Sequence, residues 1–219
     1  MTQILDALFS VYANRVPDVR KITKAMIDQG IVANQSDIIN DHVAFRTLGV
    51  PYLGIASFEK IFLAHGYQKK EFYHFNTKKL DAFWYAPPTS DLPRIFISEL
   101  KVDELSASVQ KVIKKYTDTI TSDPVNSLDL NNHQEVAAYF QTPLWQLPSL
   151  EDYETLLAEN EYAAWVIYNR YYLNHYTISV HDLPDNFCAL EPFNVFLKSI
   201  GIQLNTAGGE IKTSKDKLL

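Results

Sequence analysis

The stretch Asp41–Leu48, with the sequence DHVAFRTL, decides the fold because its side chains alternate in character. Alternation with a period of two is typical of a β-strand with two different faces. One face carries the apolar or small residues Val43, Phe45 and Thr47. The opposite face carries His42, Ala44 and Arg46. The pattern therefore predicts a strand that packs on one side and presents chemically active groups on the other.

A second stretch, His175–His181 with the sequence HYTISVH, repeats this pattern later in the chain. Gly66 follows His42 by 24 positions and Gly201 follows His175 by 26 positions. Each interval reads as a strand that opens with histidine, followed by a short helix that ends at glycine. This internal repeat predicts two βαβββ modules that bring their opening strands to one shared cavity.

The rest of the chain places these modules in an α+β fold. Around Asp41–Leu48, the patterns predict a helix from its cap at Ser57 to Leu63 and strands over Tyr67–Phe75, Leu80–Ala86 and Arg94–Leu100. After the second helix, a further strand is expected over Ile202–Ile211. We expect one domain over residues 1–219, made of N-terminal helices (1–35), a first module (40–100), a helical insertion (101–172) and an apparently truncated second module (173–219). The two modules would form an incomplete barrel.

Composition excludes several classes of protein. The chain of 219 residues is 47% hydrophobic, as is typical of a globular protein, and its net charge of −6 argues against binding to nucleic acid. No run of residues has the length and apolarity of a membrane span, and the first 20 residues do not resemble a signal peptide. Cys188 is the only cysteine, which fits a reducing compartment, and we expect a cytoplasmic protein.

Three side chains on the active faces of the two opening strands suggest a metal and substrate site. His42 and His175 occupy equivalent positions and could share one divalent ion, although strand histidines often only bond to polar neighbours. Arg46 follows His42 by four residues on the same face, about 13 Å away along the strand. Its guanidinium suits a substrate carboxylate, with a structural ion pair as the alternative.

A site of this kind normally includes a carboxylate ligand as well. Two histidines and one acidic residue with open positions are the pattern of non-haem Fe(II) oxygenases. Glu99, near the end of the last strand of the first module, and Glu210, beside glycines in the second, are the candidates. Otherwise each is a polar strand residue. The cluster Tyr162–Tyr172 is expected to pack in a core rather than to form an aromatic box.

Five separated motifs resemble a known family, the 2-oxoadipate dioxygenase/decarboxylases, whose fold resembles the vicinal oxygen chelate superfamily. The resemblance covers the chain from about residue 3 to residue 219. The motifs are DHVAFRTL (41–48), RIFISEL (94–100), LPSLEDYETLLAENEYAA (147–164), NHYTISV (174–180) and NTAGGEIK (205–212).

The resemblance implies Fe(II) held by His42, His175 and a glutamate, although a purified sample could carry another divalent metal. It implies that Arg46 binds the substrate and takes part in catalysis. The family glutamate follows the NTAGGEIK motif, in a segment beyond Leu219. The implied reaction consumes dioxygen and converts 2-oxoadipate to 2-hydroxyglutarate in lysine breakdown. The alternatives are another metal-dependent lyase, isomerase or hydrolase on the same scaffold, and a small-molecule binding module without catalysis.

Overall fold

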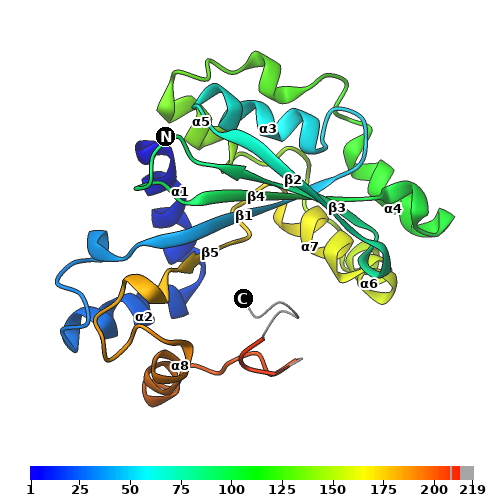
Figure 1. Cartoon of the computed structure of the whole chain (residues 1–219). Coiled ribbons are helices and arrows are strands. Elements are labelled where there is room, and N and C mark those ends of the chain that lie inside the picture. The colour runs from blue at the N-terminus through cyan, green and yellow to red at the C-terminus, as the bar shows by residue number, and fades with distance from the viewer. Residues whose placement is uncertain (208, 213–219) are drawn as a thin grey trace. The chain divides into compact units, whose positions relative to one another are not determined.

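The computed structural model describes residues 1–207 and 209–212 and has the expected α+β class (Figure 1). Its helices are α1 (Thr2–Arg15), α2 (Pro17–Asp28), α3 (Ile55–Ala64), α4 (Ala107–Thr117), α5 (His133–Tyr139), α6 (Leu150–Glu159), α7 (Glu161–Asn169) and α8 (Leu190–Ser199). Its strands are β1 (Asn40–Leu48), β2 (Gln68–Phe75), β3 (Leu80–Ala86), β4 (Arg94–Leu100) and β5 (His175–Ile178).

The strands form one open sheet of five strands in the order β2-β3-β4-β1-β5. Strand β1 runs parallel to β4, and β3 runs antiparallel to both β4 and β2. The order β1, α3, β2, β3, β4 along the chain is the βαβββ module that the sequence predicts, so this part of the prediction is confirmed.

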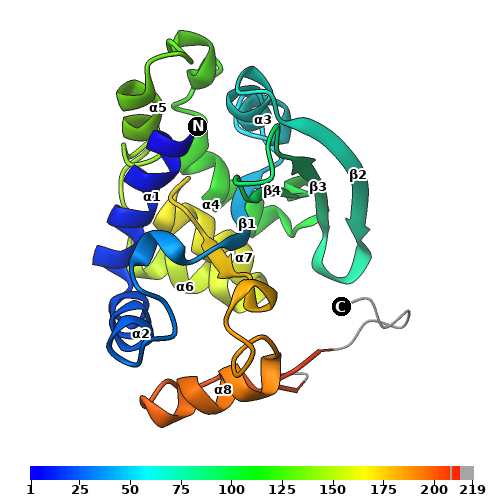
Figure 2. The same ribbon diagram turned by 60° about the vertical axis from the view of Figure 1, so that its left-hand side comes forward.

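The two faces of β1 differ as the alternating pattern requires. Val43, Phe45 and Thr47 are buried, with exposed fractions of 1% or less. Phe45 packs against Phe58 of α3, with ring centres 5.0 Å apart. In Figures 1 and 2, α3 lies on this side of the sheet, and α6 and α7 lie on the other. The sheet therefore has a closed aromatic face under α3 and a second face that carries the candidate site.

The start of α3 corrects one prediction. Ser57 does not cap the helix, because α3 begins at Ile55 with Gly54 as the preceding residue. The backbone N–H of Ile55 donates to the Glu99 carboxylate at 2.7 Å. A side chain from β4 therefore accepts a hydrogen bond from a first-turn N–H that has no partner within the helix. Ser57 instead donates its hydroxyl proton to Asp123 at 2.6 Å. This cap comes from a distant residue, so the local sequence could not indicate it.

The predicted second module is realised only in part. Helix α8 is present, and strand β5 covers His175–Ile178 rather than the whole expected range His175–His181, because Val180–Asp182 forms a 3-10 helix. The strand expected over Ile202–Ile211 is wrong: none of the described residues in this range is in a strand. A strand needs a neighbour to pair its backbone groups, and no described segment pairs with this one. Gly208 and residues 213–219 of the predicted module lie outside the described residues.

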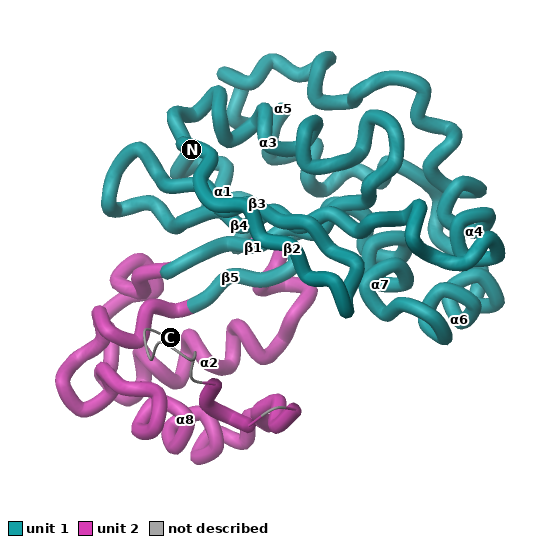
Figure 3. Tube along the Cα trace, turned by 45° about the vertical axis from the view of Figure 1, so that its right-hand side comes forward, with its two compact units in different colours: residues 1–9, 41–177 teal, residues 10–40, 178–219 magenta. Residues whose placement is uncertain are grey.

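The described chain divides into two compact units, shown in Figure 3. Unit 1 combines Met1–Phe9 with Asp41–Thr177, and unit 2 combines Ser10–Asn40 with the described residues of Ile178–Leu219. The segments expected from the sequence are consecutive along the chain, whereas each of these units combines two separate stretches. The single domain over residues 1–219 stays a prediction. The core of unit 2 joins α2 and α8 through Met26, Phe193 and Phe196. No helix among residues 1–207 and 209–212 is both long and apolar enough to cross a membrane.

Candidate active site

His42 and His175 lie next to each other on neighbouring strands of unit 1. Their ring centres are 5.5 Å apart and the ring planes meet at 79°. Two imidazoles that share one ion have ring centres about 5 Å apart, because each nitrogen lies about 2.1 Å from the metal. The structure thus brings the two predicted ligands together at a spacing close to that of a shared cation.

Hydrogen bonds on one side of His42 orient its ring. Nδ1 lies 2.9 Å from a carboxylate oxygen of Asp41 and 3.2 Å from the Thr177 hydroxyl. The backbone N–H of His42 also donates to that hydroxyl at 3.0 Å. A histidine that donates Nδ1–H to a carboxylate keeps the lone pair of Nε2 free, and this is the usual arrangement of a metal-binding imidazole.

His175 is kept neutral by its surroundings. Burial, together with the nearby charges of His42 and Arg46, lowers the pKa of the His175 imidazole to about 4. Its Nδ1 lies 2.8 Å from the side-chain amide of Asn174. Since the oxygen and nitrogen of an amide exchange by a flip, Asn174 can accept the Nδ1 proton and leave Nε2 to bind a cation. A neutral imidazole is the form that a metal requires.

Arg46 is held on the same face by aromatic rings. Its guanidinium carbon lies 4.8 Å from the ring centre of Tyr162 and 5.0 Å from that of Trp165. One guanidinium nitrogen also donates to Glu161 at 3.3 Å, and the Glu161 side chain is 68% exposed. An exposed pair of this kind is weak, so the guanidinium retains donors for an incoming carboxylate.

Tyr162 supports Arg46, although the sequence did not assign this tyrosine to the site. Its hydroxyl accepts from the backbone N–H of Thr47 at 3.1 Å and donates to the carbonyl of Ser98 at 2.9 Å. Tyr162 is buried, as the core interpretation of its cluster predicts, and its ring also supports Arg46. No pattern in the sequence distinguishes this tyrosine from one that only packs, since the contact joins β1 to α7 across the fold.

A pocket of about 460 Å³ opens on this face of the sheet. Arg46 and His175 line it, with apolar walls from Phe75, Leu80 and Phe96. Its other side chains come mainly from the start of α7 and from the turn that precedes β3; they include Lys78, Glu159, Asn160, Glu161 and Tyr162. The pocket can therefore hold an anionic molecule with an apolar middle beside His175.

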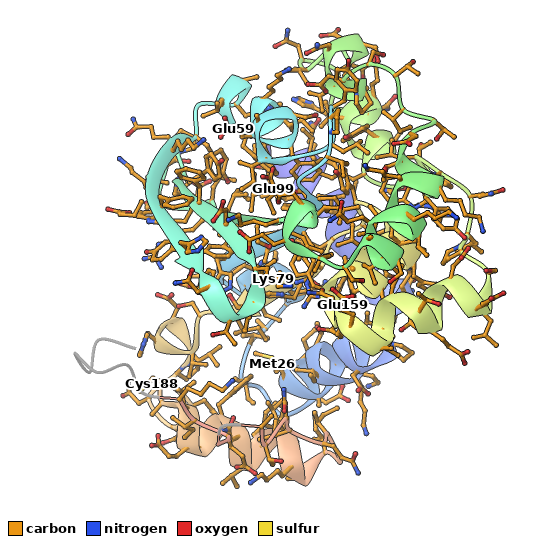
Figure 4. The ribbon with its side chains drawn as sticks, turned by 90° about the vertical axis from the view of Figure 1, so that its right-hand side faces the viewer. Met26, Glu59, Lys79, Glu99, Glu159 and Cys188 are labelled. Atoms are coloured by element: carbon orange, nitrogen blue, oxygen red, sulfur yellow. The ribbon has the colours of Figure 1, made fainter. Side chains whose placement is uncertain are left out.

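The structure corrects the proposal that Glu99 is a metal ligand. Glu99 is the register partner of Thr47, so it projects from the sheet on the face opposite His42 and Arg46. Glu99 is labelled in Figure 4, and its carboxylate accepts from the N–H of Ile55 at the start of α3. Burial, opposed in part by this hydrogen bond, raises the pKa of Glu99. Glu99 is a capping residue of α3.

The second acidic candidate, Glu210, belongs to unit 2, where its carboxylate accepts from the Lys198 ammonium at 2.6 Å. Its role as a ligand stays a prediction. Within the part of the chain that the structure describes, no group of three or more His, Cys, Asp or Glu side chains could hold a metal. The residues present therefore fit a divalent cation through two imidazoles, His42 and His175, without the expected carboxylate.

Comparison with known proteins supplies an independent line of evidence. The family model described as 2-oxoadipate dioxygenase/decarboxylase matches residues 4–219. A protein from Oryza sativa subsp. japonica, named 2-oxoadipate dioxygenase/decarboxylase, chloroplastic/amyloplastic, is 38% identical over 226 residues. That alignment covers 99% of this chain and 59% of the rice protein, so this chain spans well under two thirds of its relative's length.

Solved structures show the same relationship. The hydroxyglutarate synthase of Oryza sativa in complex with 2-oxoadipate matches with a TM-score of 0.85 and 36% identity, over 98% of this chain and 69% of that chain. A protein from Ralstonia eutropha JMP134, provisionally assigned to the glyoxalase superfamily, matches with a TM-score of 0.77 over 98% of this chain and 69% of that chain. At 21% identity, this second likeness supports the fold alone.

Proposed function

Because this chain belongs to the 2-oxoadipate dioxygenase/decarboxylase family, we propose that its pocket oxidatively decarboxylates a 2-oxo dicarboxylic acid. The proposed substrate is 2-oxoadipate, the products are 2-hydroxyglutarate and carbon dioxide, and dioxygen is the oxidant. The observation that carries the proposal is the grouping of two imidazoles and one guanidinium on one sheet face, with Arg46 and His175 lining the same pocket. We further propose a role in lysine breakdown, in the cytoplasm.

In the proposed site, the two histidines would bind the metal and Arg46 would bind the substrate. A ferrous ion bound by His42 and His175 would supply open coordination positions for the 2-oxo acid and for dioxygen. Arg46, fixed by Tyr162 and Trp165, would pair with a substrate carboxylate and orient the chain of the acid. The neutral His175 and the carboxylate-bonded His42 would hold their Nε2 lone pairs toward the cation.

Oxygen uptake tests this proposal directly. The purified chain, loaded anaerobically with Fe(II), is mixed with 2-oxoadipate, and dioxygen consumption, carbon dioxide and 2-hydroxyglutarate are measured together. For the wild-type protein we expect one molecule of carbon dioxide and one of 2-hydroxyglutarate to form for each dioxygen consumed. The His42→Ala variant should lose bound iron and activity while keeping its circular dichroism spectrum. Normal iron content in this variant would contradict the assignment of His42.

One observation favours a second candidate function, a binding module without catalysis. The described residues offer two metal ligands and no third acidic one. A module of this kind would bind a 2-oxo acid in the pocket without consuming dioxygen. Metal analysis after reloading separates the two functions: protein that binds 2-oxoadipate but retains no iron supports the module, and iron-loaded protein that consumes dioxygen supports the enzyme.

A further inference from the structure

The pocket contains two cationic side chains that differ in how they are already bonded. Arg46 has Glu161 as an ion-pair partner and rests on two aromatic rings. Lys78 lines the same pocket and is exposed. Within residues 1–207 and 209–212, the structure gives its ammonium group no hydrogen bond or ion pair. Lys78 therefore brings to the pocket a positive charge that forms no ion pair with a described residue.

The two acidic residues that also line the pocket are bonded to groups other than Lys78. Glu159 accepts both the backbone N–H and the hydroxyl proton of Ser106. These hydrogen bonds lower the pKa of Glu159, which keeps its carboxylate charged. Glu161 accepts from Arg46. An anionic ligand could thus reach Lys78 without displacing an existing ion pair of that lysine.

The position of Lys78 sets it apart from the histidines. It ends the short 3-10 helix Asn76–Lys78, which forms the turn between β2 and β3, whereas Arg46 is on β1. Strand β3 lies two places from β1 in the sheet, so their backbones are about 10 Å apart. Phe75, Leu80 and Phe96 supply apolar wall in the same pocket. The two cations therefore approach one apolar-walled space from different elements, Arg46 from β1 and Lys78 from the turn before β3.

We propose that Lys78 binds the carboxylate of the substrate remote from its 2-oxo group, and so makes the pocket selective for 2-oxo dicarboxylic acids over 2-oxo monocarboxylic acids. This inference rests on the proposed function, because it names the substrate class of the same pocket. The 2-oxo acid end would lie at Arg46 and the histidines, and the methylene chain would lie along the apolar wall. A charge-assisted hydrogen bond from the Lys78 ammonium group then stabilises only acids that carry a second carboxylate.

Two substrates of equal chain length, 2-oxoadipate and 2-oxohexanoate, test the proposal. The ratio of their kcat/KM values is measured for the iron-loaded wild type and for Lys78→Gln. We expect Lys78→Gln to lower kcat/KM for 2-oxoadipate by roughly tenfold and to leave 2-oxohexanoate unchanged, since only the dicarboxylate loses an interaction. Lys78→Arg should restore most of the preference.

The neighbouring lysine supplies a matched control. Lys79 does not line the pocket and donates to the carbonyl of Glu104 at 2.6 Å. Figure 4 labels Lys79 near Glu159. Lys79→Gln removes the same charge one residue away, so we expect it to keep the wild-type ratio. An equal loss for both acids in Lys78→Gln, or the same change in Lys79→Gln, would overturn the proposal.

Equilibrium binding separates this inference from the proposed function. Adipate and hexanoate carry no 2-oxo group, and their dissociation constants are measured by calorimetry on the same variants. If the wild type binds adipate better than hexanoate and Lys78→Gln loses that preference, Lys78 recognises the second carboxylate even where no dioxygen is consumed. If the enzyme turns over 2-oxoadipate but Lys78→Gln keeps both preferences, the proposed function stands and the role of Lys78 is refuted.

Discussion

A carboxylate oxygen of Asp41 lies 2.9 Å from Nδ1 of the adjacent His42. The other carboxylate oxygen accepts from Arg94 of β4, also at 2.9 Å. Asp41 is therefore fixed from the next strand while it orients the ring of His42. A residue beside the proposed ligand, rather than the ligand alone, decides which imidazole nitrogen is left free to bind a cation.

Asp41→Ala should weaken iron binding, because His42 loses the acceptor that holds its Nδ1 proton. Loss of such a partner typically lowers metal affinity by about 10- to 100-fold. The measurement is competitive titration of Fe(II), or of a spectroscopic substitute such as Co(II), against a chelator. Arg94→Gln is the control, since it removes the ion pair to Asp41 and leaves the contact with His42 in place. Equal iron affinity in the wild type and in Asp41→Ala would refute the role of Asp41 in orienting His42.

Tyr162→Phe should lower the free energy of unfolding by about 1 to 3 kcal/mol, because the buried N–H of Thr47 loses its acceptor. The ring that supports Arg46 is retained, so we expect the KM for 2-oxoadipate to change little. Tyr162→Leu removes the ring as well and should raise KM in addition. Urea unfolding measures the loss of stability in both variants, and steady-state kinetics measure the change in KM. A large KM increase in Tyr162→Phe would mean that the hydroxyl itself contacts the substrate.

Glu99→Gln should bind as much iron as the wild type, because Glu99 lies on the face opposite the histidines. Burial raises the pKa of Glu99, so its contribution to stability is present in acid and is lost as the pH rises through the folded-state pKa. Glutamine keeps the acceptor for Ile55 and removes the buried charge. The variant should therefore be as stable as the wild type at pH 7, or slightly more stable.

Glu99→Ala is the contrasting variant for the same residue. It leaves the N–H of Ile55 without its acceptor and should cost about 1 to 3 kcal/mol in urea unfolding. Iron content is measured on both variants by metal analysis. Loss of iron from folded Glu99→Gln would restore Glu99 as a candidate ligand.

Asp123→Asn should remove part of the acid sensitivity of the protein. Burial of Asp123 would raise its pKa, but hydrogen bonds from Lys60, Ser57 and the backbone of Val125 outweigh it and lower the pKa below 3.8. Its contribution is thus present above about pH 4 and is lost as the pH falls through the folded-state pKa. We expect Asp123→Asn to be about 1 kcal/mol less stable at pH 7, with a smaller difference at pH 3. A constant difference at both pH values would contradict this linkage.

The strand pattern of the first module could be predicted because each strand carries its own periodicity. The alternation in Asp41–Leu48 predicts that Val43, Phe45 and Thr47 share a packed face, and all three are buried. The strand expected over Ile202–Ile211 was wrong in its described part, since periodicity indicates a tendency to be extended but supplies no pairing partner.

The face on which a residue lies depends on information that the local sequence lacks. The place of Glu99 near the end of β4 makes it a candidate ligand when the sequence is considered alone. The parallel register with β1 pairs it with Thr47 and turns it away from His42. A shift of that register by one residue would have placed it on the other face, because side chains alternate along a strand.

The amino-acid order alone determined the βαβββ module, the alternating faces of β1 and the presence of two histidines and an arginine that could act together, because these features depend on neighbours along the chain. Only the tertiary structure decided that Tyr162 and Trp165 support Arg46, that Lys78 faces the same pocket and that Glu99 caps α3. Those relationships join segments far apart in the chain, and strand pairing and side-chain packing bring them into contact.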